Sequence, residues 1–115
     1  MIIKKTFHFD AAHFLENYDG PCKNLHGHTF LLTIALQGKV DDHTGMVLDF
    51  RKLKAIVKQE ILCKVDHVCL NEVLDFNPTC ENMVKWIYEK LNTKLNIHSI
   101  ELKEGLGGSA RYPQN

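Results

Sequence analysis

Two segments within the first 40 residues alternate apolar and polar side chains with a period of two. This pattern constrains the fold more than any other feature of the chain. Residues 2–13 place four side chains in phase on one face: Phe7, Phe9, Ala11 and His13. Residues 27–40 place four more in phase: Phe30, Leu32, Ile34 and Leu36. A period of two is typical of a strand that buries one face, so we expect two long strands that pair as a hairpin.

Two helices are predicted after these strands. A turn at residues 41–45 (DDHTG) leads to Asp49, which is a suitable N-cap for the first helix. The apolar stripe of this helix has helical spacing: Phe50, Leu53, Ile56, Val57 and Ile61. Residues 65–79 form a connection with mixed signals, and Thr79 is a suitable N-cap for the second helix. The second stripe is Met83, Val84, Ile87 and Leu91.

Apolar and polar side chains alternate again in the C-terminal part of the chain. Residues 98–104 are predicted to form a strand, residues 105–108 (GLGG) a turn and residues 109–113 a short last strand. The order ββααββ predicts an α+β fold, with a mostly antiparallel four-stranded sheet and both helices on one face. Two helices cannot cover both faces of four strands, and the sheet edges also need a partner. We therefore expect a homo-oligomer.

Composition excludes several classes of protein. A length of 115 residues predicts a single domain over residues 1–115. The 14 basic residues balance the 14 acidic ones and 44% of residues are hydrophobic, which argues against disorder and nucleic-acid binding. The N-terminus lacks a signal-peptide core, and no apolar run approaches the ~20 residues of a membrane span. We expect a cytoplasmic protein with no membrane partner, whose four cysteines are thiols.

Two histidines flank a glycine in the stretch His26-Gly27-His28. On a strand, residues i and i+2 point to the same side, so both imidazoles can converge on one ion. His13 ends the first strand, and pairing as a hairpin brings it near both. Three histidines with an open fourth position form a catalytic zinc arrangement. The alternative is that a His-x-His pair on a strand binds no metal.

Cys22 lies four residues before His26, and the residues alone leave three interpretations open. Cys22 can be a fourth ligand that closes a structural site with three histidines. It can instead be a free thiol beside the metal, where the positive charge favours a thiolate that acts as a general base or nucleophile. The third interpretation is an inert cysteine in a loop.

Asp66 and His67 are adjacent, and a carboxylate beside an imidazole can fix its tautomer. Adjacent side chains need not face each other, so two surface polar residues are the alternative. Cys63 and Cys69 flank this pair without the spacing of metal ligands. We expect both cysteines to be small buried hydrophobes.

Three further polar residues are candidates for ligand contacts. Thr79 and Glu81 open the second helix, where capping and the helix dipole explain both residue types. The same helix N-terminus offers free N–H groups to a polar ligand. Glu104 ends an alternating strand, either as a solvated charge or as a carboxylate that points into a cleft.

Several motifs in this order resemble the 6-pyruvoyl-tetrahydropterin synthase/6-carboxy-tetrahydropterin synthase family. They are FDAAHFL at 9–15, CKNLHGHTF at 22–30, DHTGMVLDFRKLK at 42–54, DHVCLN at 66–71, NPTCEN at 77–82 and KE at 103–104. Each is weak alone, but their order and spacing are specific, and they run nearly end to end. The resemblance implies a T-fold (tunnelling fold), in which subunits close into barrel-shaped trimers that commonly stack as hexamers.

The resemblance also implies roles for residues. The zinc (Zn²⁺) ligands of the family correspond to His13, His26 and His28. Its catalytic cysteine corresponds to Cys22, and its catalytic Asp-His pair to Asp66 and His67. Its pterin-anchoring glutamate corresponds to Glu104, and the threonine and glutamate of its PTxE segment, near the pterin pocket, to Thr79 and Glu81. The family often has threonine and serine after the anchoring glutamate, where this chain has GLGGSARY, so local contacts around the pterin are expected to differ.

The implied substrate is 7,8-dihydroneopterin triphosphate. The CxxxHGH spacing from Cys22 is similar to that of bacterial 6-carboxytetrahydropterin synthases, which release acetaldehyde and triphosphate on the 7-deazaguanine route to queuosine. The animal pyruvoyl-forming enzymes have a longer spacing with Cys-Asn-Asn. Elimination of triphosphate without carbon–carbon cleavage is the first alternative. A zinc-stabilised oligomeric binding protein without turnover is the second.

Overall fold

The two N-terminal strands pair along their whole length. In the computed structural model, which describes residues 1–114, β1 (Ile2–His13) and β2 (His26–Gln37) form one antiparallel hairpin. The second strand ends three residues before the predicted limit. β4 (Ile97–Glu104) begins opposite Leu36, so its pairing with β2 stops one residue before the end of β2.

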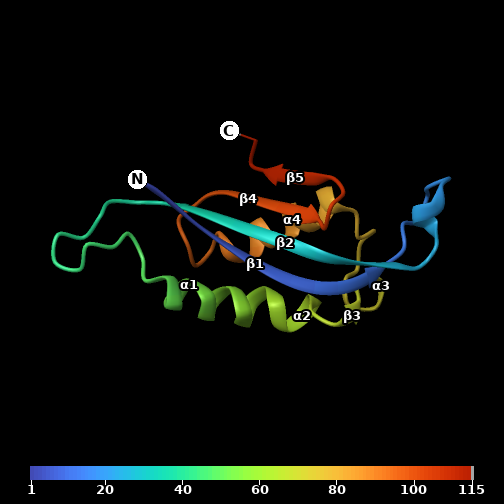
Figure 1. Ribbon diagram of the computed structural model, residues 1–115, viewed down its shortest axis with the longest axis horizontal. Helices are drawn as coiled ribbons and strands as arrows, with labels where there is room; N and C mark the ends of the chain where they lie inside the picture. Colours follow the sequence, from blue (N-terminus) through green and yellow to red (C-terminus); the bar gives the residue numbers. More distant parts are fainter. Residues whose placement is uncertain (115) are drawn as a thin grey trace.

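The sheet contains five strands in the order β3-β1-β2-β4-β5 (Figure 1). The four predicted strands are confirmed, with β5 (Ser109–Tyr112) antiparallel to β4. The additional strand is β3 (Val68–Cys69), which pairs in parallel with β1 at Ala11 and Ala12. Two residues are too few to show a period, so the sequence pattern gave no sign of β3. The predicted α+β class holds with this addition.

The first predicted helix is one continuous helical segment with three parts. They are α1 (Phe50–Val57), a π-helical turn η2 (Lys58–Leu62) and α2 (Cys63–Val65). The Asp49 side chain accepts from the Arg51 N–H at 2.8 Å, which confirms the predicted N-cap. The fully buried stripe repeats every four residues: Leu53, Val57, Ile61 and Val65.

Two predictions about cysteine burial in this region are wrong. Cys63 lies midway between Ile61 and Val65 in sequence, so it faces away from the buried stripe and is exposed. Its thiol donates to the Gln59 carbonyl instead of packing in the core. Cys69 is only half-buried, because it belongs to the short edge strand β3.

The second predicted helix is α4 (Cys80–Leu91). Thr79 is its N-cap, because the Thr79 hydroxyl accepts a hydrogen bond from the Asn82 N–H at 3.1 Å. A short helix, α3 (Leu70–Val73), lies in the connection before it. The long helices cover one face of the sheet (Figure 1). The core between helices and sheet includes Phe9, Phe30 and Ile87. Within residues 1–114, no helix has both the length and the apolar character needed to cross a bilayer.

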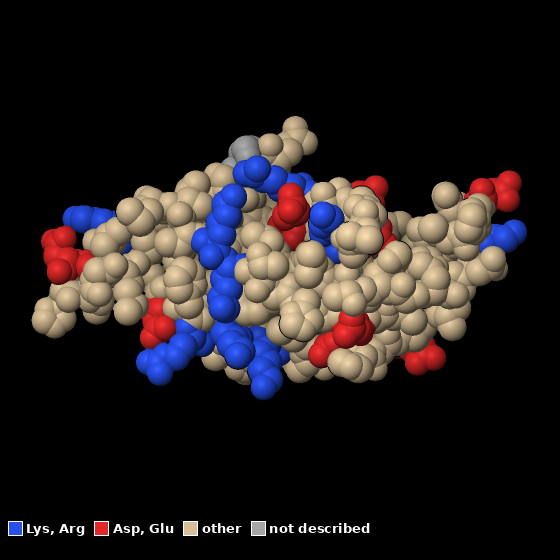
Figure 2. All heavy atoms as spheres, in the orientation of Figure 1, with Lys and Arg blue, Asp and Glu red and all other residues tan. Residues whose placement is uncertain are grey.

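The opposite face of the sheet carries mainly polar side chains, with Ile2 and Leu31 as exposed apolar exceptions. Along β1 the exposed positions are Ile2, Lys4, Thr6, His8 and Asp10. Thr6 and the facing Thr33 share a hydroxyl–hydroxyl hydrogen bond of 2.9 Å on this helix-free face. Figure 2 shows Lys and Arg side chains as a band across the molecule in the same view. The expected partner subunit would therefore meet a mainly polar sheet face.

Candidate active site

The hairpin of β1 and β2 brings three histidine side chains together at one end of the sheet. His13 lies opposite His26, and His28 lies opposite Ala11, so all three point to the face that the helices cover. Their ring centroids are 4.6 to 5.2 Å apart. One nitrogen from each ring lies within 4.8 Å of the others, close enough to bind one ion. This group is called the histidine cluster below.

Backbone carbonyls orient two of these rings. His13 Nδ1 is 2.8 Å from the Pro78 carbonyl, and His26 Nδ1 is 2.8 Å from the Asn24 carbonyl. A carbonyl only accepts, so Nδ1 carries the proton and Nε2 keeps its lone pair in the neutral ring. His13 is 1% exposed, and its Nε2 has no hydrogen-bond partner among residues 1–114. A buried, unpartnered lone pair is what a metal ion would satisfy, so the cluster fits a metal.

Burial lowers the pKa of His13, and the neighbouring His26 and His28 act in the same direction. The Pro78 carbonyl and the Glu104 carboxylate raise it, but the lowering effects prevail. Because a metal binds the neutral imidazole, this shift keeps His13 in its ligating form at neutral pH.

Glu104 borders the histidine cluster. It lies opposite Phe30 at the end of β4, and its Oε2 is 3.4 Å from His13 Nε2 and 3.3 Å from His28 Nε2. The side chain is 24% exposed, so part of the carboxylate remains open to a ligand. A carboxylate facing two imidazole nitrogens suits a cation or a cationic N–H edge.

Cys22 lies in the loop between β1 and β2, within the 3₁₀ turn η1 (Pro21–Lys23). Its carbonyl accepts the Leu15 N–H at 2.8 Å, which folds the loop back toward the end of β1. The thiol is half-buried. Among residues 1–114, the ligand atoms that lie mutually within 4.8 Å around His13 come from histidines alone and do not include the Cys22 sulfur. The structure therefore does not bring Cys22 to the cluster as a fourth ligand.

Two asparagines that the sequence analysis missed hold the segment after His13. Asn71 exchanges two hydrogen bonds of 2.9 Å with the backbone of Phe14. Asn77 does the same with Glu16, at 3.0 and 3.1 Å. Both asparagines lie in motifs quoted above, but the sequence carries no signal for the backbone groups they bind. They tie the entrance of the Cys22 loop to the connection before α4.

The N-terminus of α4 meets the end of β4 beside the cluster. The Cys80 thiol donates to the Leu102 carbonyl at 3.1 Å, while Thr79 acts as the N-cap and Glu81 is exposed in the first turn. Burial raises the pKa of Cys80 to about 12, and the Glu104 and Glu81 carboxylates add to the effect. Cys80 is thus a neutral thiol at physiological pH.

We expect Cys80 to resist alkylation by iodoacetamide at pH 8 in the folded protein, because its raised pKa leaves almost no thiolate. The exposed Cys63 is the internal control and should react readily. Peptide mass spectrometry before and after denaturation measures both sites. Equal labelling of Cys80 and Cys63 in the folded protein would contradict this expectation.

Asp66 and His67 face each other, although adjacent residues need not do so. Asp66 Oδ1 is 2.9 Å from His67 Nδ1. His67 has a φ of 61°, a left-handed conformation that turns its ring back toward the preceding carboxylate. An ionised carboxylate only accepts, so the neutral ring carries its proton on Nδ1 and leaves Nε2 free. The pair has the geometry of an oriented acid/base group.

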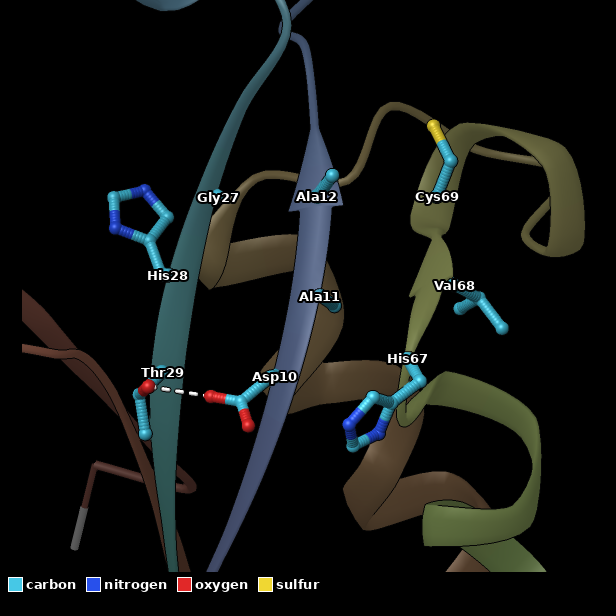
Figure 3. A pocket seen from close by; sticks show the side chains of 9 residues that line it. All are labelled: Asp10, Ala11, Ala12, Gly27, His28, Thr29, His67, Val68 and Cys69. Atoms are coloured by element: carbon cyan, nitrogen blue, oxygen red, sulfur yellow. Dashed lines mark hydrogen bonds between the residues drawn. The ribbon is translucent and has the colours of Figure 1, made fainter.

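This pair and the histidine cluster belong to different sides of the sheet. Asp66 and His67 lie next to Asp10, whose side chain is on the helix-free face. An open depression of about 580 Å³ lies there, and its wall includes Thr29 and His67 but also His28 of the histidine cluster. Figure 3 shows the His28 ring pointing away from Asp10 and His67. Within one chain, His28 and His67 thus border the same depression, but their rings point in different directions.

Comparison with known proteins identifies the family. A match to the family described as 6-pyruvoyl tetrahydropterin synthase covers residues 2–115. The chain belongs to this family. A solved structure of 6-pyruvoyl tetrahydropterin synthase from Caenorhabditis elegans is 28% identical with a TM-score of 0.88, over 97% of this chain and 94% of that chain. This likeness confirms the T-fold expected from the sequence.

Two curated relatives carry different names. A protein of Synechocystis sp. named 6-carboxy-5,6,7,8-tetrahydropterin synthase is 37% identical, over 96% of this chain and 92% of the relative. A protein of Pyrococcus furiosus named dihydroneopterin monophosphate aldolase is 40% identical, over 76% of this chain and 71% of the relative. Family members similar to this chain thus have names for more than one pterin reaction.

Proposed function

We propose that this protein is a zinc-dependent enzyme that converts 7,8-dihydroneopterin triphosphate to 6-carboxy-5,6,7,8-tetrahydropterin, with release of acetaldehyde and triphosphate, on the route to queuosine. The observation that carries the proposal is the unpartnered, buried His13 Nε2 in a three-histidine cluster that Glu104 borders. The full-length similarity to a relative named for this reaction supports it. A cytoplasmic homo-oligomer, a trimer or hexamer, is part of the proposal.

His13, His26 and His28 would hold the zinc ion, with Nε2 of His13 as one ligand. Three histidines with an open position are the ligand set of catalytic zinc sites. When bound, the ion would act as a Lewis acid toward the hydroxyl oxygens of the substrate side chain.

Glu104 would hold the pterin ring. Its carboxylate accepts hydrogen bonds only, which matches a ring N–H and an adjacent amino group. With Oε2 3.3 Å from His28 Nε2, a ring anchored on Glu104 places its side chain beside the metal position. Thr79 and Glu81, at the start of α4, would lie near the pterin pocket.

Cys22 would move protons on the substrate side chain as a thiolate, and the Asp66–His67 pair would be the second acid/base group. Asp66 holds the Nδ1–H of His67, so His67 Nε2 would exchange the proton with substrate. Because His67 lies toward the helix-free face, we infer that it serves a site whose zinc and Cys22 come from a neighbouring subunit.

This arrangement predicts complementation between two inactive variants. A 1:1 mixture of Cys22→Ala and His67→Ala subunits should regain about one quarter of wild-type activity after denaturation and reassembly, since random assembly leaves that share of shared sites intact. The measurement is turnover of the mixture against each variant reassembled alone. No gain in the mixture would mean that each subunit completes its own site.

The test of function is incubation with 7,8-dihydroneopterin triphosphate and identification of products by mass spectrometry. The proposal expects 6-carboxytetrahydropterin and acetaldehyde in equal amounts. A 6-pyruvoyl product without acetaldehyde would overturn it in favour of the pyruvoyl-forming reaction. The relative named as an aldolase raises a second candidate, cleavage of dihydroneopterin monophosphate, so the monophosphate is assayed in parallel.

A further inference from the structure

We propose that Asp10, held by Thr29, is a positioning residue for the Asp66–His67 pair. This inference rests on the proposed function, in which His67 is an acid/base group. Asp10 was not among the candidate residues of the sequence analysis. It lies on the helix-free face of β1 and is directly paired with Thr29 on β2.

The backbone of Asp10 holds both members of the pair. Its N–H donates to Asp66 Oδ1 at 3.0 Å, and its carbonyl accepts the His67 N–H at 2.6 Å. Asp66 Oδ1 therefore receives the Asp10 N–H as well as the His67 ring N–H. These contacts dock the segment of Asp66 and His67 onto the edge of β1, just before the β3 pairing begins at Ala11.

The side chain of Asp10 adds a second carboxylate beside the His67 ring. The Thr29 hydroxyl donates to Asp10 Oδ1, which fixes the direction of the carboxylate (Figure 3). Ligand atoms of Asp10, Asp66 and His67 all lie within 4.8 Å of one another. Two carboxylates, one from β1 and one from the turn before β3, thus face the same imidazole.

Polar contacts must set the ring direction because packing does not. The His67 side chain is 77% exposed. His67 also has a left-handed backbone conformation, which is uncommon for a residue other than glycine. Little apolar contact is available to hold an exposed ring in one rotamer. The Asp66 contact places the proton on Nδ1 only while the ring faces it, and the Asp10 charge favours the ring orientation in which an N–H edge faces the carboxylates. Loss of the Asp10 charge should therefore disorder the ring without unfolding the sheet.

The kinetic test compares four single variants. Asp10→Asn keeps the shape and backbone contacts but removes the charge, and Thr29→Val removes the hydroxyl at constant shape. Each is expected to lower kcat about 10-fold with KM changed less than about twofold, the size of effect found for groups that orient a functional imidazole. Thr29→Ser should rescue what Thr29→Val loses. Thr6→Val, which deletes a hydroxyl elsewhere on the same face, is the matched control and should retain wild-type kcat.

The second readout is NMR of protein labelled with ring-¹⁵N histidine, which reports the tautomer of His67 without any substrate. The wild type should show the Nδ1–H tautomer, and Asp10→Asn and Thr29→Val should show signals of a second tautomer. Unchanged His67 signals in both variants would overturn the proposal, as would an unchanged kcat or equal losses in Thr29→Ser and Thr29→Val. If the wild type fails to turn over the pterin substrate, the proposed function fails while the NMR comparison still decides the role of Asp10.

Discussion

Replacing His13 by alanine is expected to empty the metal site and to lower kcat/KM at least about 1,000-fold, because a bound metal supplies several kcal/mol of charge stabilisation to a reaction of this kind. His13 is the most deeply buried member of the histidine cluster, and its Nε2 has no hydrogen-bond partner among residues 1–114, although Glu104 Oε2 lies 3.4 Å away. Two imidazoles alone are a weak site for zinc.

The metal content of the purified variant, measured by elemental mass spectrometry, checks this directly. His8→Ala is the matched control, since His8 lies on the same strand but is exposed on the helix-free face. It should retain wild-type zinc and activity. His26→Ala is a second test at a less buried position, in case His13→Ala lowers stability by leaving the Pro78 carbonyl unpaired. Equimolar zinc in both cluster variants would contradict the assignment of the ligands.

The histidine cluster could be predicted from the sequence because it depends on local rules. A period of two fixes which side chains share a face, and a hairpin fixes which residues lie opposite each other. The observed register, with His13 opposite His26 and Phe9 opposite Phe30, follows from the apolar phase of both strands. Buried apolar residues on one face leave little freedom for a register shift, so the register of the core also determines the positions of the three histidines.

The remaining groups depend on contacts between distant segments, and for these the sequence was less informative. The contact between the Asp66 and His67 side chains depends on the left-handed backbone conformation of His67, which no local sequence pattern predicts. The approach of Glu104 to the cluster depends on the pairing of β2 with β4. The position of His67 near Asp10 depends on β3, which is too short to predict. The sequence named these side chains but not the face of the sheet to which each belongs.

Replacing Cys22 by alanine is expected to leave the zinc content near wild type and to lower kcat about 100-fold or more, the usual cost of losing a general base. The physical reason is that the cluster of mutually close ligand atoms is complete without the Cys22 sulfur. Zinc content and turnover are measured on the same preparation. Cys63→Ala is the matched control, because Cys63 is an exposed thiol on the helical segment and should affect neither quantity.

This pair of measurements separates catalysis from a structural metal site. If zinc is lost together with the thiol, Cys22 is a fourth ligand, the coordination sphere is closed, and the protein is a zinc-stabilised binding protein. If zinc stays and turnover falls, an open metal position lies beside a thiol that moves protons. We expect the second outcome, because the three histidine ligand atoms lie within 4.8 Å of one another without the Cys22 sulfur. The thiol can then approach the substrate from the loop without competing for the metal.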